Sequence, residues 1–170
     1  MGAGAPCAYP ENQRFTLCHH THRARREEVP TPRIVEARLR VRYAETDAQG
    51  VAYYANYFVW FEVARVHYLR ACGEDYRAWE AQGLGINIVE AACRYFAPAR
   101  FDDPLVVRAW VSHVGNSSFR FEYQVLHEER GDLLAEGHTV QVFVDLRAGR
   151  SVPIPPPLRQ VLAAQEDGDA

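Results

Sequence analysis

The stretch that decides the fold is residues 43–57, which read YAETDAQGVAYYANY. It places Asp47 and Gly50 directly before a long apolar segment. The first turn of a helix leaves backbone N–H groups without intrahelical acceptors, and the helix dipole favours negative charge beside them. The stretch therefore predicts that a carboxylate and exposed N–H donors share one small volume, a pairing that acyl transfer needs.

The apolar segment that follows has the period of a helix. Apolar residues recur at steps of four, three, four and four, which is the spacing of one helix face. They are Tyr57, Phe61, Ala64, Tyr68 and Cys72. Gly73 then ends the predicted helix. Because the other faces also carry apolar residues, we expect other elements to enclose this helix.

Strands are predicted on both sides of the helix. Residues 34–43 alternate apolar and polar side chains, as a half-buried strand does. Four later segments read as strands: residues 86–96, 105–112, 117–127 and 133–145. Turn residues separate them, prolines at 153 and 155–157 close the sheet region, and residues 158–164 predict a short helix. The pattern predicts an α+β domain whose mainly antiparallel sheet curls around one long helix.

Composition restricts the class of protein. A length of 170 residues with 48% hydrophobic content fits one domain. The net charge of −3 gives no general attraction to nucleic acid. No run approaches the roughly 18 consecutive apolar residues of a membrane span. Four separated cysteines without a C-x-x-C pair, and no leader of signal-peptide type, predict a cytoplasmic protein.

The chain divides into one domain and two tails. Residues 1–33 have neither a helix nor a strand period and are expected to form a flexible tail, the domain covers residues 34–164, and residues 165–170 form a C-terminal tail. Cys18 and the histidines at 19, 20 and 22 lack the spaced second pair of a structural zinc site. We therefore expect no metal site.

Asp47 has two interpretations. An Asp at this position commonly caps a helix or stabilises a turn. Against this, Val51, Tyr53, Tyr54 and Tyr57 place apolar and aromatic surface around it. Such surroundings raise the cost of an unpaired carboxylate. We therefore favour a working acid.

Several spaced motifs resemble those of the hotdog-fold acyl-CoA thioesterases of the 4-hydroxybenzoyl-CoA thioesterase type. They are Tyr-x-x-Thr-Asp-x-x-Gly-Val-x-Tyr-x-x-Asn-Tyr from Tyr43, FEVAR at 61–65, YFAPARFDD at 95–103 and GNSSF at 115–119. The likeness covers residues 38–155. It implies a hotdog fold and hydrolysis of an acyl-CoA to free acid and CoA, with no metal and no redox cofactor. It also implies a homodimer or homotetramer with the site at the seam between subunits.

The resemblance also assigns roles to residues. Asp47 would be the catalytic carboxylate, as nucleophile or general base. The backbone N–H of Tyr54 would polarise the thioester carbonyl, and Gly50 would let the backbone turn closely enough for both groups to reach it. Asn56 and Tyr57 belong to the same motif and would contact the substrate.

The resemblance places the CoA part of the substrate near a second turn. That turn is formed by Gly115, Asn116, Ser117 and Ser118, and a plain β-turn is the alternative. Arg100 would meet a phosphate, or form a structural pair with Asp102 or Asp103. Aromatic residues after Asp47 fit an aromatic acyl group, or simply fill the core.

Three alternatives stay open at this point. Glu62 is a rival acid, although its spacing to Arg65 predicts a helix-face ion pair. A hotdog enoyl-thioester hydratase would pair the Asp with a nearby His, but no His follows Asp47 until His67. A non-catalytic acyl-CoA-binding module would need no acid. No histidine is assigned to catalysis, because Tyr54 stands where many relatives carry His.

Overall fold

The computed structural model describes residues 34–163. The two predicted tails and the Cys18 to His22 cluster therefore lie outside the described residues. The predicted C-terminal helix is described as far as Ala163. The strands are β1 (Val35–Arg40), β2 (Leu84–Tyr95), β3 (Pro104–Val114), β4 (Ser118–His127), β5 (Leu133–Asp145) and β6 (Arg150–Ser151). The helices are α1 (Asn56–Ala71), α2 (Tyr76–Ala81) and α3 (Pro156–Ala163), with a short 3-10 helix at Tyr43–Glu45.

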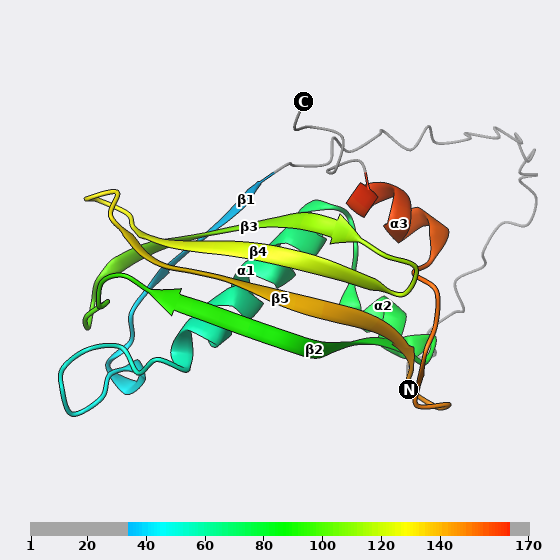
Figure 1. The fold of residues 1–170 in the computed structure, drawn as a ribbon, viewed down its shortest axis with the longest axis horizontal. Helices are drawn as coiled ribbons and strands as arrows, with labels where there is room; N and C mark the ends of the chain where they lie inside the picture. The colour runs from blue at the N-terminus through cyan, green and yellow to red at the C-terminus, as the bar shows by residue number, and fades with distance from the viewer. Residues whose placement is uncertain (1–33, 164–170) are drawn as a thin grey trace, which may run out of the picture.

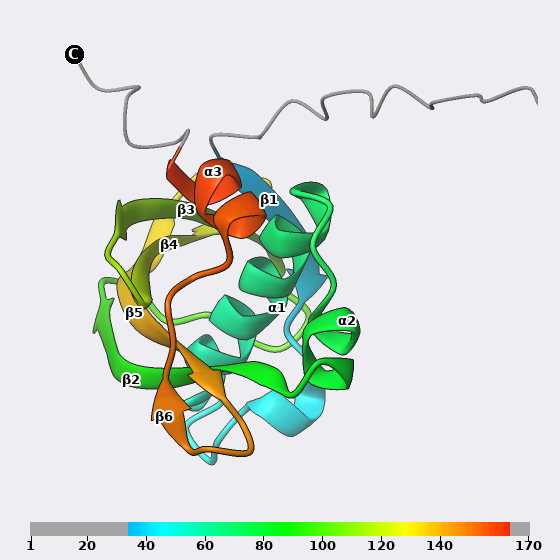
Figure 2. The ribbon, with the colours of Figure 1, turned by 90° about the vertical axis from the view of Figure 1, so that its right-hand side faces the viewer.

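One antiparallel sheet curls around α1. Its strand order is β1-β3-β4-β5-β2, and β6 pairs with β5. Figures 1 and 2 show α1 lying in the hollow of the curled sheet, with α3 beside it. This confirms the predicted α+β architecture and the hotdog arrangement that the resemblance implies. No helix within residues 34–163 is both long and apolar enough to cross a membrane.

The core is centred on aromatic contacts between α1 and β4. The Phe61 and Tyr123 rings stack with centroids 4.4 Å apart. Gly137 on β5 makes this contact possible, because a Cβ there would lie 2.7 Å from the Phe61 ring and would also collide with the Ala92 carbonyl. A residue without a side chain is therefore needed where the Phe61 ring of α1 packs against β5.

Two expectations were wrong in part. Residues 34–43 were expected to form one strand, but β1 ends at Arg40 and the chain then turns into the 3-10 helix. Tyr43, the last apolar residue of that alternation, is 77% exposed and packs edge-on against Phe101. Helix α1 is also not fully enclosed, because Val59 and Val63 are 45% and 36% exposed. Helix α2 and strand β6 were not predicted.

The two edges and the two ends of the sheet matter for function. Strands β1 and β2 form the edges, and residues 87–92 of β2 are all exposed. Arg40 pairs with Pro104 and Val35 with Ala109, so the loop after β1 and the turn after β3 lie at opposite ends.

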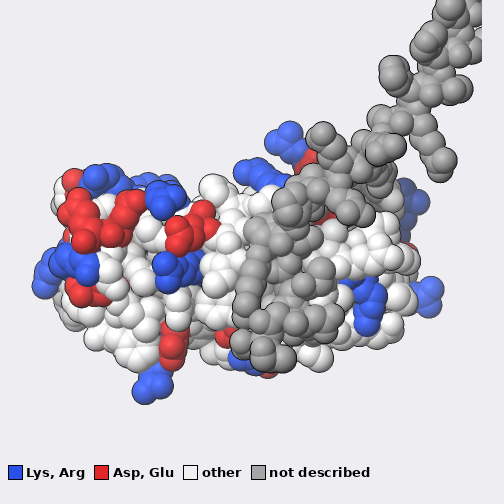
Figure 3. Space-filling model, turned by 90° about the horizontal axis from the view of Figure 1, so that it is seen from above, with Lys and Arg blue, Asp and Glu red and all other residues white. Residues whose placement is uncertain are grey.

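Seen from above, acidic and basic side chains lie side by side at one end rather than in patches of one sign (Figure 3).

Candidate active site

The Asp47 loop is a tight, backbone-bonded turn. Thr46 and Ala52 form an isolated antiparallel bridge, the Asp47 N–H donates to the Val51 carbonyl at 2.9 Å, and the Gly50 N–H donates to the Asp47 carbonyl at 3.0 Å. Gly50 has a φ of +74°, which L-residues with a side chain rarely adopt. A Cβ on Gly50 would meet no atom within 4 Å. Within one chain, glycine is therefore required by backbone conformation and not by close approach.

The Asp47 carboxylate is half-buried. Its Oδ1 accepts a hydrogen bond from the Gln49 N–H at 2.8 Å, which is the turn-forming use of Asp. Among the described residues Oδ2 has no hydrogen bond. The aromatic enclosure expected around the acid is incomplete in one chain, because Tyr53 and Tyr54 are 45% and 59% exposed. The carboxylate thus keeps one oxygen available for chemistry.

The peptide before Tyr54 is held firmly, but its N–H is left without an acceptor. The Tyr53 N–H donates to the Glu45 carbonyl at 2.8 Å, and the Tyr53 carbonyl accepts from the Asn56 N–H at 2.9 Å. The Tyr95 hydroxyl donates to the Tyr54 carbonyl at 3.0 Å. Within residues 34–163 nothing accepts a hydrogen bond from the Tyr54 N–H. A fixed, unused donor at a helix start is the geometry of an oxyanion site.

Asn56 and Tyr57 support this arrangement from inside. The Asn56 amide donates to the Glu45 carbonyl at 2.7 Å. The Tyr57 hydroxyl accepts from the Ala99 N–H at 3.2 Å, and burial raises the pKa of this hydroxyl. Their described polar contacts are thus to the protein, and substrate contact by either residue stays a prediction.

An aromatic cavity opens beside the start of α1. It has a volume of about 270 Å³, and its lining includes the Tyr54, Tyr57, Tyr95 and Phe96 side chains. The Tyr57 and Tyr95 rings meet edge-on with centroids 5.0 Å apart. Because Tyr54 belongs to both features, the cavity adjoins the unused N–H donor.

Arg100 lies in the loop that touches the Asp47 turn, where the Ala52 N–H donates to the Ala99 carbonyl at 2.8 Å. The Asp103 carboxylate accepts from the backbone N–H of Arg100 at 2.8 Å, and Asp102 is paired instead with Arg40 at 3.5 Å. Among the described residues no carboxylate lies within 4.0 Å of the Arg100 guanidinium. The side-chain pair expected as one alternative is therefore not formed.

The second predicted turn lies at the other end of the sheet. The Gly115 N–H donates to the Ser118 carbonyl at 2.7 Å, which closes the turn. Its outer carbonyls are used by the same chain: Arg159 Nη1 donates to the Gly115 carbonyl at 2.5 Å, and the Ile154 N–H donates to the Asn116 carbonyl at 3.0 Å. Because the Asp47 loop and this turn lie at opposite ends of the sheet, one chain does not bring them together.

The rival acid is not paired as expected. Glu62 is exposed, and no ion pair joins it to Arg65 in the described part of the chain. Arg65 points its Nε to the Tyr76 hydroxyl at 3.2 Å instead. Helix α2, which supplies Tyr76, was missing from the prediction, and this explains the wrong partner.

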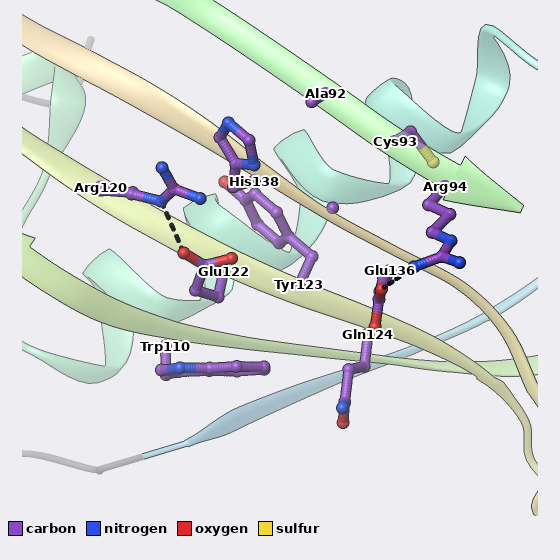
Figure 4. Close-up of a pocket in the computed structure, with 11 residues that line it drawn as sticks. Ala92, Cys93, Arg94, Trp110, Arg120, Glu122, Tyr123, Gln124, Glu136 and His138 are labelled. Carbon is purple, nitrogen blue, oxygen red and sulfur yellow. Dashed lines mark hydrogen bonds and ion pairs between the residues drawn. The ribbon is translucent and has the colours of Figure 1, made fainter.

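Figure 4 shows a different hollow, about 380 Å³, lined by residues of β2, β3, β4 and β5. Trp110 and Glu122 alternate along their strands with buried residues, so they face away from α1. The charged side chains here pair with each other, Arg120 with Glu122 at 2.6 Å and Arg94 with Glu136 at 4.0 Å. None of the predicted site residues lines this hollow.

Sequence reasoning missed two residues near the site, Glu45 and Tyr95. Glu45 is only 4% exposed and contacts both the loop and α1. The signal was an acid two residues before Asp47, three residues after a possible partner, Arg42. The contact of Tyr95 depends on the end of β2 lying beside the start of α1, which sequence alone does not reveal.

Comparison with known proteins agrees with this geometry. A family model described as the thioesterase-like superfamily matches residues 41–162. The acyl-CoA thioesterase YbgC of Haemophilus influenzae is 36% identical over 119 residues, which cover 69% of this chain and 85% of that protein. The 1,4-dihydroxy-2-naphthoyl-CoA hydrolase of Thermosynechococcus vestitus is 34% identical over 130 residues, which cover 76% of this chain and 88% of that protein.

A solved structure of a gentisyl-coenzyme A thioesterase has a TM-score of 0.70 at 29% identity, over 75% of this chain and 99% of that one. The family model thus spans most of the chain, and the relatives match along most of their own lengths. The chain belongs to the thioesterase-like superfamily, and its curled sheet around α1 is a hotdog fold.

Proposed function

We propose that this enzyme hydrolyses an acyl-CoA thioester to free acid and CoA, with Asp47 as the catalytic carboxylate. The observation that carries the proposal is the pairing of a half-buried Asp47, one oxygen of which has no hydrogen bond among the described residues, with the unused Tyr54 N–H at the start of α1. Family membership supports thioester hydrolysis as the reaction class.

Two chemical routes use these groups. As a general base, Asp47 takes a proton from water while the water oxygen bonds to the thioester carbon. As a nucleophile, it forms an acyl anhydride that water then cleaves. On either route the carbonyl oxygen becomes negative and is stabilised by the Tyr54 N–H and the helix dipole, the C–S bond breaks, and CoA leaves as a thiolate that takes up a proton.

The complete site requires a second copy of the chain. Asp47 and the Gly115–Ser118 turn lie at opposite ends of one sheet. Strand β2 is an exposed edge with Ile88 and Val89 43% and 61% exposed. If two β2 strands pair antiparallel, the sheets join and the Asp47 end of one chain approaches the turn end of its partner. We propose a homodimer as the minimum assembly, from which a homotetramer can be built.

The substrate would then span the seam. Its CoA part would meet the partner's turn, while Arg100 would meet a phosphate. Two of the similar proteins act on aromatic acyl groups by name, and the adjoining cavity is lined by aromatic rings. Aromatic acyl-CoA thioesters are therefore the first substrates to test. We further propose that no metal or redox cofactor takes part and that the enzyme acts in the cytoplasm.

Release of free thiol tests the function. The assay compares aromatic, short, medium and long acyl-CoA thioesters and an acyl-carrier-protein thioester, with and without a chelator. We expect turnover of at least one class, unchanged by chelation, and a loss of roughly 10²-fold or more in Asp47→Asn. Glu62→Gln is the matched control and should lose far less.

Three other results would support the binding module, the hydratase or Glu62 as the acid. Acyl-CoA binding without thiol release by the wild type would favour the binding module. Hydration of an enoyl thioester without thiol release would favour the hydratase. A greater loss in Glu62→Gln than in Asp47→Asn would move the acid to the helix.

A further inference from the structure

We propose that Glu45 is a positioning residue that holds the Asp47 loop and the Tyr54 N–H in register. This inference rests on the proposed function, because it concerns the geometry of those two groups. Glu45 lies two residues before Asp47, at the end of the 3-10 helix, and is 4% exposed. It is the acid at which β1, the loop and α1 meet.

The Glu45 side chain joins two elements. Its Oε2 accepts from the backbone N–H of Arg42 at 2.8 Å. Its Oε1 accepts from Arg42 Nη2 at 2.8 Å and from the Trp60 indole N–H at 3.2 Å. Arg42 follows β1, whereas Trp60 lies on the buried face of α1. The carboxylate therefore fixes the distance between the end of β1 and the second turn of the helix.

The Glu45 backbone fixes the oxyanion peptide. Its carbonyl accepts from the Tyr53 N–H at 2.8 Å and from the Asn56 side-chain amide at 2.7 Å. The next residue, Thr46, pairs with Ala52 in the bridge that closes the Asp47 loop. Both reacting groups are therefore linked to Glu45: Asp47 through the chain, and the Tyr54 peptide through the hydrogen bonds of its neighbours Tyr53 and Asn56.

The chemistry of the pocket requires a carboxylate. Three N–H donors converge on the two oxygens, and no hydrogen-bond acceptor faces them in the described residues. A glutamine amide would turn one N–H group toward another donor in either orientation, so it cannot satisfy this site. Because the Arg42 side chain is 71% exposed, its ion pair with Glu45 contributes little net stability. A role in geometry explains the buried carboxylate better than a role in stability.

The test compares Glu45→Gln with Glu36→Gln. Glu36 also accepts from an arginine, Arg108 at 3.0 Å, but on the exposed face of the sheet. We expect kcat to fall on the order of 10²-fold in Glu45→Gln with KM changed less than about threefold, because small displacements of reacting groups cost this much. Glu36→Gln should keep both constants. A kcat close to the wild-type value in folded Glu45→Gln would overturn the inference.

Two further variants test the inference independently of Glu45→Gln alone. If Glu45→Gln does not fold, Arg42→Met decides, because the Arg42 side chain is 71% exposed and its loss leaves the core intact. A tenfold lower kcat at unchanged KM is expected, and an unchanged kcat would overturn the inference. The double variant with Asp47→Asn should lose less than the product of the single losses. Full multiplication would also overturn it. Failure of the wild type to release thiol would instead overturn the proposed function.

Discussion

The two ends of the curled sheet are built differently. At one end, Asp47 keeps a carboxylate oxygen and Tyr54 keeps an N–H that no described residue uses. At the other end, the carbonyls of Gly115 and Asn116 are held by Arg159 and by the chain after β6. The first end has reactive groups available, whereas the second is a rigid turn stabilised by its own chain. The Asp47 end offers reactive groups, and the Gly115 turn end offers a preformed binding surface.

The contrast between the two ends suits a small domain that acts on a long substrate. Residues 34–163 form one curled sheet around one long helix, and within them no further layer covers the Asp47 loop. Joining the β2 edges of two copies would place a chemical end beside a rigid end twice, by symmetry. The following experiments separate the two ends or test their dependence on each other.

The largest effect is expected from breaking the β2 edge. Val89→Arg places a charge on a side chain that is 61% exposed in one chain but would be covered in joined sheets. We expect a folded monomer at micromolar concentration in sedimentation, with at least about tenfold lower activity. Ile34→Arg, at the start of the other edge and 50% exposed, should change neither. A fully active Val89→Arg monomer would show that one chain suffices.

The next effect concerns the rigid end alone. Asn116→Asp adds a negative charge to an exposed side chain at the turn without changing its shape. If the turn faces CoA phosphates, repulsion should raise KM about tenfold and leave kcat nearly unchanged. Gln82→Glu, which adds the same charge just after α2, is the control. Equal KM values in steady-state kinetics of both variants would remove the turn from the CoA site.

A smaller effect is expected from loosening the turn. Arg159→Met removes the guanidinium that donates to the Gly115 carbonyl at 2.5 Å. Stability should fall by about 1.5–3 kcal/mol in chemical denaturation, the range for hydrogen bonds to charged groups. We expect KM to rise only a few-fold, since the β3–β4 connection still closes the turn. Arg150→Met on β6 serves as control. A large loss of kcat would mean that the turn influences the chemistry directly.

The smallest effect is a pH dependence at the chemical end. Burial alone would raise the pKa of Glu45, but hydrogen bonds from Arg42 and Trp60 outweigh it and lower the pKa overall. The pKa of Glu45 is lower in the folded state than its unfolded value of about 4.3. The ionised carboxylate therefore stabilises the fold at pH values above about 4.3. This contribution disappears as pH falls through the folded pKa. Denaturation at pH 7 and at lower pH should therefore show the advantage of wild type over Glu45→Gln shrinking in acid.

The sequence predicted the individual helices and strands more accurately than the contacts between them. The apolar period placed the long helix within one residue of α1, and the last strand pattern matched β5 at both bounds. Helix α2 was missed because six residues are too few for a clear period, although Asp75 does cap it by accepting from the Arg77 N–H. Strand β6 is two residues long and has no pattern of its own.

In the candidate site, too, local groupings were predicted and contacts between distant segments were not. Asp47, Gly50 and the Tyr54 N–H are neighbours along the chain, so a local motif was enough to group them. The separation of Asp47 from the Gly115 turn depends on the register between β1 and β3, which no local pattern contains. The Glu45 contacts likewise require Trp60 on α1 to reach back to the loop, and only the folded chain shows this.

Mixed dimers test the central claim, that each site combines the Asp47 end of one chain with the turn end of its partner. Asp47→Asn and Asn116→Asp chains are unfolded together, refolded at equal amounts and assayed at low substrate concentration. Half of randomly assembled dimers are mixed, and each mixed dimer would contain one site with both changes and one with neither. We therefore predict recovery to about one quarter of the wild-type rate. A rate no higher than the average of the two parent variants would contradict the claim.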